Sequence, residues 1–239
     1  MNKYGYRFSF GPWNIHEGAD PFGPTVRPAR AFADKLKVYQ DLGFDAVQFH
    51  DDDAVPNLDA LTPAQIRERA RAVRGQLADL GLGAEFVAPR LWEDPRTVDG
   101  AYTANDPQAR AYAIERSKRA ADIAAELGTD LMVLWLAREG TYLREAKDAV
   151  RATQHLLEAI NAILDYAPAL RIVDEPKPNE PMDIAYLPTM GHALALGFQT
   201  KDPGRVGALM ESAHAILAGL DPADECAFAL AFDKLWSVH

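Results

Sequence analysis

Two clusters of charged residues each follow a short apolar run. His50-Asp51-Asp52-Asp53 comes directly after residues 46–49, and Glu175-Pro176-Lys177 begins the proline-rich segment 175–181 shortly after residues 170–173. The buried strands of parallel α/β proteins end at the edge of the sheet where active sites lie. A histidine beside carboxylates can transfer protons, and a glutamate two residues before a lysine can hold a metal ion next to a positive charge. The pattern therefore indicates chemistry at the ends of two strands.

The elements that must position these residues alternate along the chain. Apolar runs predict seven strands, at residues 6–10, 46–49, 84–87, 131–134, 170–173, 206–209 and 235–238. Helical segments separate them, and one of these, residues 66–80, carries apolar residues at helical spacing with arginines opposite. Thr62-Pro63 and Asp106-Pro107 are typical helix starts. Each interval therefore fits one βα unit.

Regular βα alternation predicts a parallel sheet, either open and doubly wound or closed as a barrel. We favour a TIM (β/α)8-type barrel, because residues that could carry out chemistry follow nearly every predicted strand. In an open sheet, we would expect them only at a single switch point. Seven strands are predicted and such a barrel needs eight. We therefore expect residues 1–239 to form one α/β barrel domain that is incomplete at its C-terminus.

Composition narrows the class of protein. The chain has 239 residues, 48% of them apolar, which is enough for a sizeable core. Its 25 basic and 35 acidic residues give a net charge of −10, which argues against nucleic acid or anionic lipid as a partner. The single cysteine, Cys226, cannot form an internal disulfide, and no long apolar segment predicts a signal peptide or a membrane span. We expect a cytoplasmic protein.

Seven motifs in order along the chain resemble the D-xylose isomerase family. They are Phe10-Gly11-Pro12-Trp13, Asp20-Pro21-Phe22-Gly23, Phe49-His50-Asp51-Asp52-Asp53, Tyr102-Thr103-Ala104-Asn105-Asp106, Trp135 with Arg138-Glu139-Gly140, Glu175-Pro176-Lys177-Pro178-Asn179-Glu180-Pro181, and Leu187-Pro188-Thr189 with Gly191-His192-Ala193. Several are weak alone, but their order and spacing make the resemblance strong.

The resemblance implies two catalytic groups. His50 would assist opening of the cyclic sugar while Asp53 orients its imidazole, and Lys177 would polarise the carbonyl oxygen at C1. A solvated polar loop is the plainer interpretation of each cluster taken alone.

The resemblance also implies two divalent metal ions, Mg²⁺, Mn²⁺ or Co²⁺, and no organic cofactor. Glu175 and Glu211 match metal-bridging glutamates, and His214 matches a histidine ligand. The segment around Glu211 and His214 departs from the usual family pattern, so a helical surface pair stays an alternative. His239 stands where better-known members have a metal-binding aspartate, so we expect it to be a neutral ligand.

Aromatic residues complete the implied sugar pocket. Trp13, Trp92 and Trp135 would form its walls, and Phe22 would reach into a partner subunit, which implies a homo-oligomer. Core packing is the alternative for the tryptophans. Asp174, within an apolar run beside Glu175, has no explanation in the sequence.

The implied function is interconversion of an aldose and a ketose, such as D-xylose and D-xylulose or D-glucose and D-fructose, by a metal-assisted 1,2-hydride shift. Two alternatives stay open: a divergent metal-dependent sugar epimerase barrel, and a non-catalytic fragment of such an enzyme.

Overall fold

The computed structural model describes residues 5–18 and 24–239. These residues form two compact units. The first unit contains residues up to Val87 together with Asp122–Thr129, and the second contains Ala88–Ala121 and Asp130–His239. Phe22 lies outside the described residues, and the expectation of a single domain stays a prediction.

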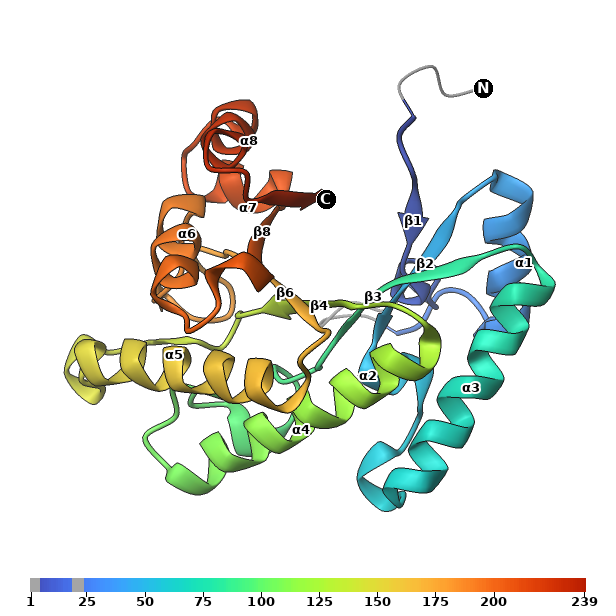
Figure 1. Ribbon diagram of the computed structural model, residues 1–239, viewed down its shortest axis with the longest axis horizontal. Helices are drawn as coiled ribbons and strands as arrows, with labels where there is room; N and C mark the ends of the chain where they lie inside the picture. Colours follow the sequence, from blue (N-terminus) through green and yellow to red (C-terminus); the bar gives the residue numbers. More distant parts are fainter. Residues whose placement is uncertain (1–4, 19–23) are drawn as a thin grey trace. The chain divides into compact units, whose positions relative to one another are not determined.

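The first unit repeats a strand followed by helices. Its elements are β1 (Ser9–Phe10), a 3-10 turn (Pro12–Asn14), α1 (Phe32–Leu42), β2 (Ala46–His50), α2 (Asp51–Ala54), a 3-10 turn (Leu58–Ala60), α3 (Pro63–Asp79) and β3 (Gly83–Ala88). The strands lie in the order β1-β2-β3, and β1 is parallel to β2. Figure 1 shows these elements in blue to green.

The local sequence explains where these helices begin and end. Thr62 caps α3 by accepting a hydrogen bond from the Gln65 amide, while the Gln65 side chain accepts one from the Thr62 amide. Gly43 adopts a left-handed φ of 76° immediately after α1, where a side chain would be strained. The predicted stripe of α3 is buried at Ile66, Ala70 and Leu77.

The second unit holds four more parallel strands. Its elements are a 3-10 turn (Pro95–Thr97), α4 (Pro107–Leu127, whose last turns belong to the first unit), β4 (Leu131–Trp135), β5 (Gly140–Thr141), a 3-10 turn (Arg144–Ala146), α5 (Ala149–Tyr166), β6 (Arg171–Glu175), β7 (Ile184–Ala185), α6 (Met190–Gln199), a 3-10 turn (Pro203–Arg205), β8 (Val206–Met210), α7 (Ser212–Leu217), α8 (Pro222–Ala231) and β9 (Leu235–Val238). The strand order is β4-β6-β8-β9.

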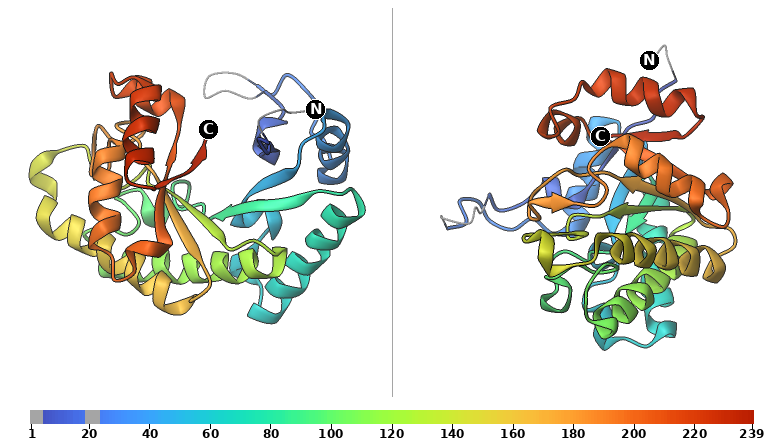
Figure 2. Two further views of the ribbon diagram at one scale, coloured as in Figure 1. Left: turned by 45° about the horizontal axis from the view of Figure 1, so that its top comes forward. Right: turned by 90° about the vertical axis from the view of Figure 1, so that its left-hand side faces the viewer.

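The register of these strands aligns the ends that carry polar residues. Trp135, the last residue of β4, lies opposite Glu175, the last residue of β6. Val173 of β6 lies opposite Gly207 of β8. The helices α6 and α8 pack against β8 and against each other, and Figure 2 shows them side by side. No helix among the described residues is long and apolar enough to cross a membrane.

All seven predicted strands are present, with some bounds displaced. The run predicted as a strand at 6–10 pairs only over Ser9–Phe10, and the strand predicted at 170–173 extends to Glu175. This extension adds two acidic residues to the strand, Asp174 and Glu175, and both pair with β4. The short antiparallel pair of β5 and β7 has no strand pattern in the sequence.

Candidate functional site

In the first unit, His50 and Asp53 form a close pair. His50 ends β2 and Asp53 lies in the first turn of α2, where its carboxylate accepts a hydrogen bond from the His50 amide. The same oxygen lies 2.8 Å from Nδ1 of His50. The Trp13 ring lies over the imidazole, with 4.1 Å between centroids. A carboxylate at Nδ1 fixes the ring tautomer so that Nε2 is the nitrogen that exchanges a proton.

In the second unit, three predicted metal ligands come together. Glu175, Glu211 and His239 each offer one ligand atom, and these atoms lie within 4.8 Å of one another. Nδ1 of His239 is 3.9 Å from a carboxylate oxygen of Glu211. Two carboxylates and an imidazole are donors that Mg²⁺, Mn²⁺ or Co²⁺ accept, so this donor set fits a divalent ion.

His214 lies beside this trio with its ring directed at two neighbours. Its Nε2 is 3.4 Å from the Lys177 ammonium, and its Nδ1 is 3.5 Å from Glu175. Burial, together with the positive charge of Lys177, lowers the pKa of His214 to about 4. The imidazole is therefore neutral, and because Lys177 can only donate, Nε2 accepts and Nδ1 carries the proton.

The site is buried and holds several ionisable groups close together. The side chains of Glu175 and Lys177 are each about 10% exposed. Burial and the neighbouring Glu211 carboxylate raise the pKa of Glu175 to about 8, while Lys177 acts in the opposite direction. Two carboxylates this close repel each other, and a cation bound between them would relieve that repulsion.

Two of the predicted aromatic walls pack against each other next to these groups. Trp92 and Trp135 meet edge to face, with 4.4 Å between ring centroids. The Lys177 ammonium lies 5.3 Å from the centre of the Trp135 ring, and the His214 ring stacks on the same tryptophan at 6.4 Å. Both tryptophans are half-buried, and their role as walls of a sugar pocket stays a prediction.

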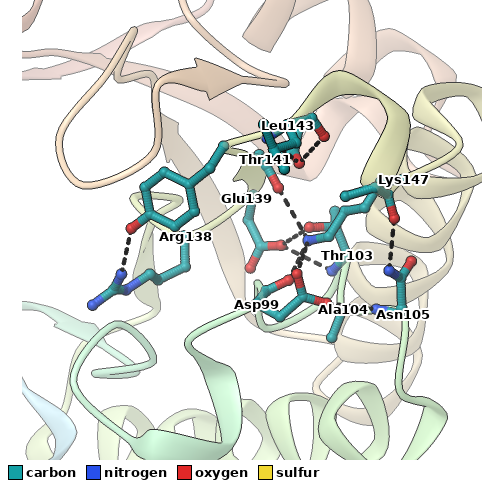
Figure 3. A network of polar contacts seen from close by, with 12 residues as sticks. Asp99, Thr103, Ala104, Asn105, Arg138, Glu139, Thr141, Leu143 and Lys147 are labelled. Carbon is teal, nitrogen blue, oxygen red and sulfur yellow. Dashed lines mark hydrogen bonds and ion pairs between the residues drawn. The ribbon is translucent and has the colours of Figure 1, made fainter.

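A buried carboxylate anchors the loop that follows β4 (Figure 3). Glu139 is 2% exposed and accepts hydrogen bonds from the backbone amides of Ala101, Tyr102 and Thr103 and from the Thr103 hydroxyl. Burial raises the pKa of Glu139, whereas these four donors favour its charged form.

The residues on either side of Glu139 extend the anchor. Arg138 donates a hydrogen bond to the carbonyl oxygen of Trp92, and the buried Lys147 donates one to the carbonyl of Gly140 at 3.0 Å. The anchor therefore fixes the backbone next to the Trp92–Trp135 pair. The sequence identifies Arg138-Glu139-Gly140 as a motif, but it does not indicate that Glu139 holds this loop. It gives no signal for the role of Lys147.

Asp174 is separate from this site. Strand alternation turns its side chain to the face of β6 opposite Glu175, where it is fully buried and neither carboxyl oxygen has a hydrogen-bond partner among the described residues. Burial raises its pKa to about 7.

The structure therefore assembles the predicted residues in two groups. Trp13, His50 and Asp53 lie together in the first unit, and Trp92, Trp135, Glu175, Lys177, Glu211, His214 and His239 lie in the second. Convergence of the two groups on one pocket stays a prediction, as do the roles of these residues.

Comparisons with known proteins give the family and the fold class. A family model described as xylose isomerase-like TIM barrel matches residues 36–239, which confirms the predicted resemblance and fold class. A xylose isomerase from Thermus thermophilus is 36% identical over 239 residues, which cover 98% of this chain and 61% of that protein. The chain thus spans less than two thirds of that relative's length.

Solved structures with low sequence identity share the fold. A 3-keto-D-glucoside 4-epimerase from E. coli superimposes with a TM-score of 0.68 at 14% identity, over 98% of this chain and 77% of its own. A D-psicose 3-epimerase gives a TM-score of 0.67 at 15% identity, over 98% and 72%. These likenesses show the fold alone.

Proposed function

Because the chain belongs to the xylose isomerase-like TIM barrel family, we propose that it supplies the metal- and sugar-binding residues of a metal-dependent aldose–ketose isomerase. The observation that carries the proposal is the approach of Glu175, Glu211 and His239 to within 4.8 Å, with Lys177 close to Glu175. Three hard or borderline donors beside one buried ammonium suit a metal ion and a polarised sugar oxygen.

Glu175, Glu211 and His239 would hold a divalent ion, with His214 as a fourth donor once its ring is released from Lys177. When bound, such an ion polarises sugar oxygens and stabilises the negative charge that develops on them. The two carboxylates offset part of the ion's charge, whereas His239 contributes a neutral donor.

Lys177 would donate a hydrogen bond to the carbonyl oxygen of the open-chain sugar. Its ammonium is nearly buried and faces His214 and the Trp135 ring, so its direction is restrained. Trp92 and Trp135 would cover the apolar face of the sugar and exclude water.

His50 would transfer the proton that accompanies opening of the cyclic sugar. Asp53 supports this role by holding Nδ1 at 2.8 Å. The substrate we propose is D-xylose or D-glucose, in line with the relative's printed name, with the enzyme acting as a cytoplasmic homo-oligomer.

The first test is titration of the chain with Mn²⁺ by calorimetry, followed by measurement of ketose formed from D-xylose or D-glucose. Glu211→Gln removes one carboxylate charge at nearly constant shape, so we expect Mn²⁺ affinity to fall about tenfold, or about 1.4 kcal/mol. Glu115→Gln, an exposed glutamate on α4, is the matched control and should bind Mn²⁺ normally.

The outcomes separate the candidate functions. Lys177→Gln should keep Mn²⁺ binding and reduce ketose formation. Mn²⁺ binding without ketose favours a non-catalytic chain that carries the metal site, and an epimeric sugar as product favours an epimerase. Absence of Mn²⁺ binding contradicts the proposal.

A further inference from the structure

The pairing of β8 with β9 contains one extra residue on β9. Ala208 lies opposite Leu235, but the next two pairs are Leu209 with Ser237 and Met210 with Val238. Trp236 is therefore the extra residue, which has no partner in the register of β8. The ladder then continues, because the His239 amide donates to the Met210 carbonyl at 2.8 Å and the Ser212 amide donates to the His239 carbonyl at 3.0 Å. This is a β-bulge at Trp236.

The bulge decides which way His239 faces. Met210 pairs with Val238, so His239 is level with Glu211, and residues level with each other on neighbouring strands turn to the same face. If the register of the Ala208–Leu235 pair continued without the bulge, Val238 would lie level with Glu211. His239 would then turn to the opposite face, because a shift of one residue reverses every side chain.

The Trp236 ring packs directly on the backbone of Gly207, where any larger residue would place a Cβ atom against the ring. A Cβ atom built on Gly207 would lie 2.3 Å from the Trp236 ring. Two cations flank the ring, with the Arg171 guanidinium 5.4 Å and the Lys234 ammonium 5.7 Å from its centre.

Both cations are themselves restrained. Arg171 donates two hydrogen bonds to the Asp130 carboxylate, and Lys234 donates to the Val206 carbonyl at 2.8 Å. The Trp236 ring therefore packs on the β8 backbone at Gly207, and two restrained cations lie over the ring.

We propose that Trp236, seated on Gly207, is a positioning residue that creates the bulge and thereby turns His239 toward Glu175 and Glu211. The proposal rests on the proposed function in so far as His239 acts there as a metal ligand. The residues that offer ligand atoms are Glu175, Glu211 and His239, so Trp236 and Gly207 would act through the register of β9.

A double-mutant cycle tests this route. Gly207→Ala displaces the ring, and Trp236→Ala removes it, so each should lower Mn²⁺ affinity by about tenfold to a hundredfold, as changes that misplace a ligand do. In a His239→Ala background, the same two changes should have no further effect on affinity. A purely structural role would lower affinity equally in both backgrounds and would overturn the proposal.

Deletion of Trp236 provides a rescue. Removing the extra residue leaves Ser237, Val238 and His239 opposite Leu209, Met210 and Glu211 without any bulge. The combination of Gly207→Ala with this deletion should therefore recover the parent's Mn²⁺ affinity. Gly191→Ala is the matched control in the same unit, since its added Cβ would meet its nearest neighbour at an ordinary 3.7 Å.

A metal-free measurement separates this inference from the proposed function. NMR should show a nuclear Overhauser contact between the His239 ring and the Glu211 side chain in the parent and in the rescued chain, and its loss in Trp236→Ala. If the parent shows the contact but binds no Mn²⁺, the proposed function is contradicted while the inference about the bulge still holds. A contact that survives in Trp236→Ala and Gly207→Ala overturns the inference.

Discussion

At the scale of single residues, two buried carboxylates have opposite surroundings. Glu139 receives four hydrogen bonds, whereas the oxygens of Asp174 receive none from the part of the chain that the structure describes. A buried polar group without a partner costs free energy, and a fully paired one holds its neighbours in place. The first residue therefore orders a loop, and the second weakens the strand that carries Glu175.

We expect Asp174→Val to stabilise the protein. The pKa of Asp174 rises from 3.8 to about 7 on folding, so the folded state keeps a proton that the unfolded state loses. The parent's stability should therefore fall as the pH rises from about 4 to 7, by at most about 1.4 kcal/mol per unit, and level off above.

Urea unfolding of both chains at pH 5 and pH 7.5 measures this difference, and the advantage of the valine variant should be larger at pH 7.5. Asp174→Asn is the matched control: it cannot ionise, so it should lose the pH dependence while gaining less stability. An equal advantage at both pH values contradicts the expectation.

For Glu139→Gln we expect a loss of about 2–3 kcal/mol of unfolding free energy. The amide group presents N–H where the backbone of residues 101–103 also presents N–H, so at least one buried donor loses its acceptor. Chemical denaturation measures the loss. Thr103→Ser retains the hydroxyl that donates to Glu139 and should cost less than about 1 kcal/mol.

At the scale of elements, the sequence predicts the strands well and their fine pairing poorly. Apolar runs bounded by helix caps identify the seven strands other than β5 and β7, because burial on both faces of a parallel sheet requires continuous apolar residues. The same rule ends the strand before Asp174, although the backbone continues to pair through Glu175. The Trp236 bulge depends on the space above Gly207, and no local pattern signals it.

The C-terminal end of α5 is held by the side chain of Arg205. Arg205 donates hydrogen bonds to the carbonyl oxygen of Leu164 in the last turn of α5 and to those of Ala167 and Leu170 just after the helix. The helix leaves the Leu164 carbonyl without a donor, because the residue four positions on is a proline. Arg205→Lys keeps the charge but loses the fork of donors, so we expect a loss of about 1–2 kcal/mol in thermal or urea unfolding. Arg151→Lys, in an exposed ion pair on the same helix, should change stability by less than about 0.5 kcal/mol. Equal effects would contradict this account.

At the scale of the whole molecule, the candidate site depends on residues far apart in the chain. Glu175 and Glu211 follow the apolar cores of β6 and β8, and parallel pairing brings these strand ends together. The sequence could predict this meeting from strand order alone. It could not predict that Lys177 would face His214, because side-chain direction beyond a strand end depends on packing.

Metal binding should appear as a change in global stability. Mn²⁺ that binds the folded chain and not the unfolded one raises the melting temperature in proportion to the logarithm of its concentration, with a gain of about 2.7 kcal/mol at a hundred times Kd. We expect this rise in the parent chain, measured by scanning calorimetry, and a much smaller rise in Glu175→Gln. Glu115→Gln, whose exposed carboxylate lies on α4, should behave as the parent does. An equal rise in all three chains would mean that Mn²⁺ binds elsewhere, and it would separate the Glu175–Glu211–His239 cluster from any metal-dependent chemistry.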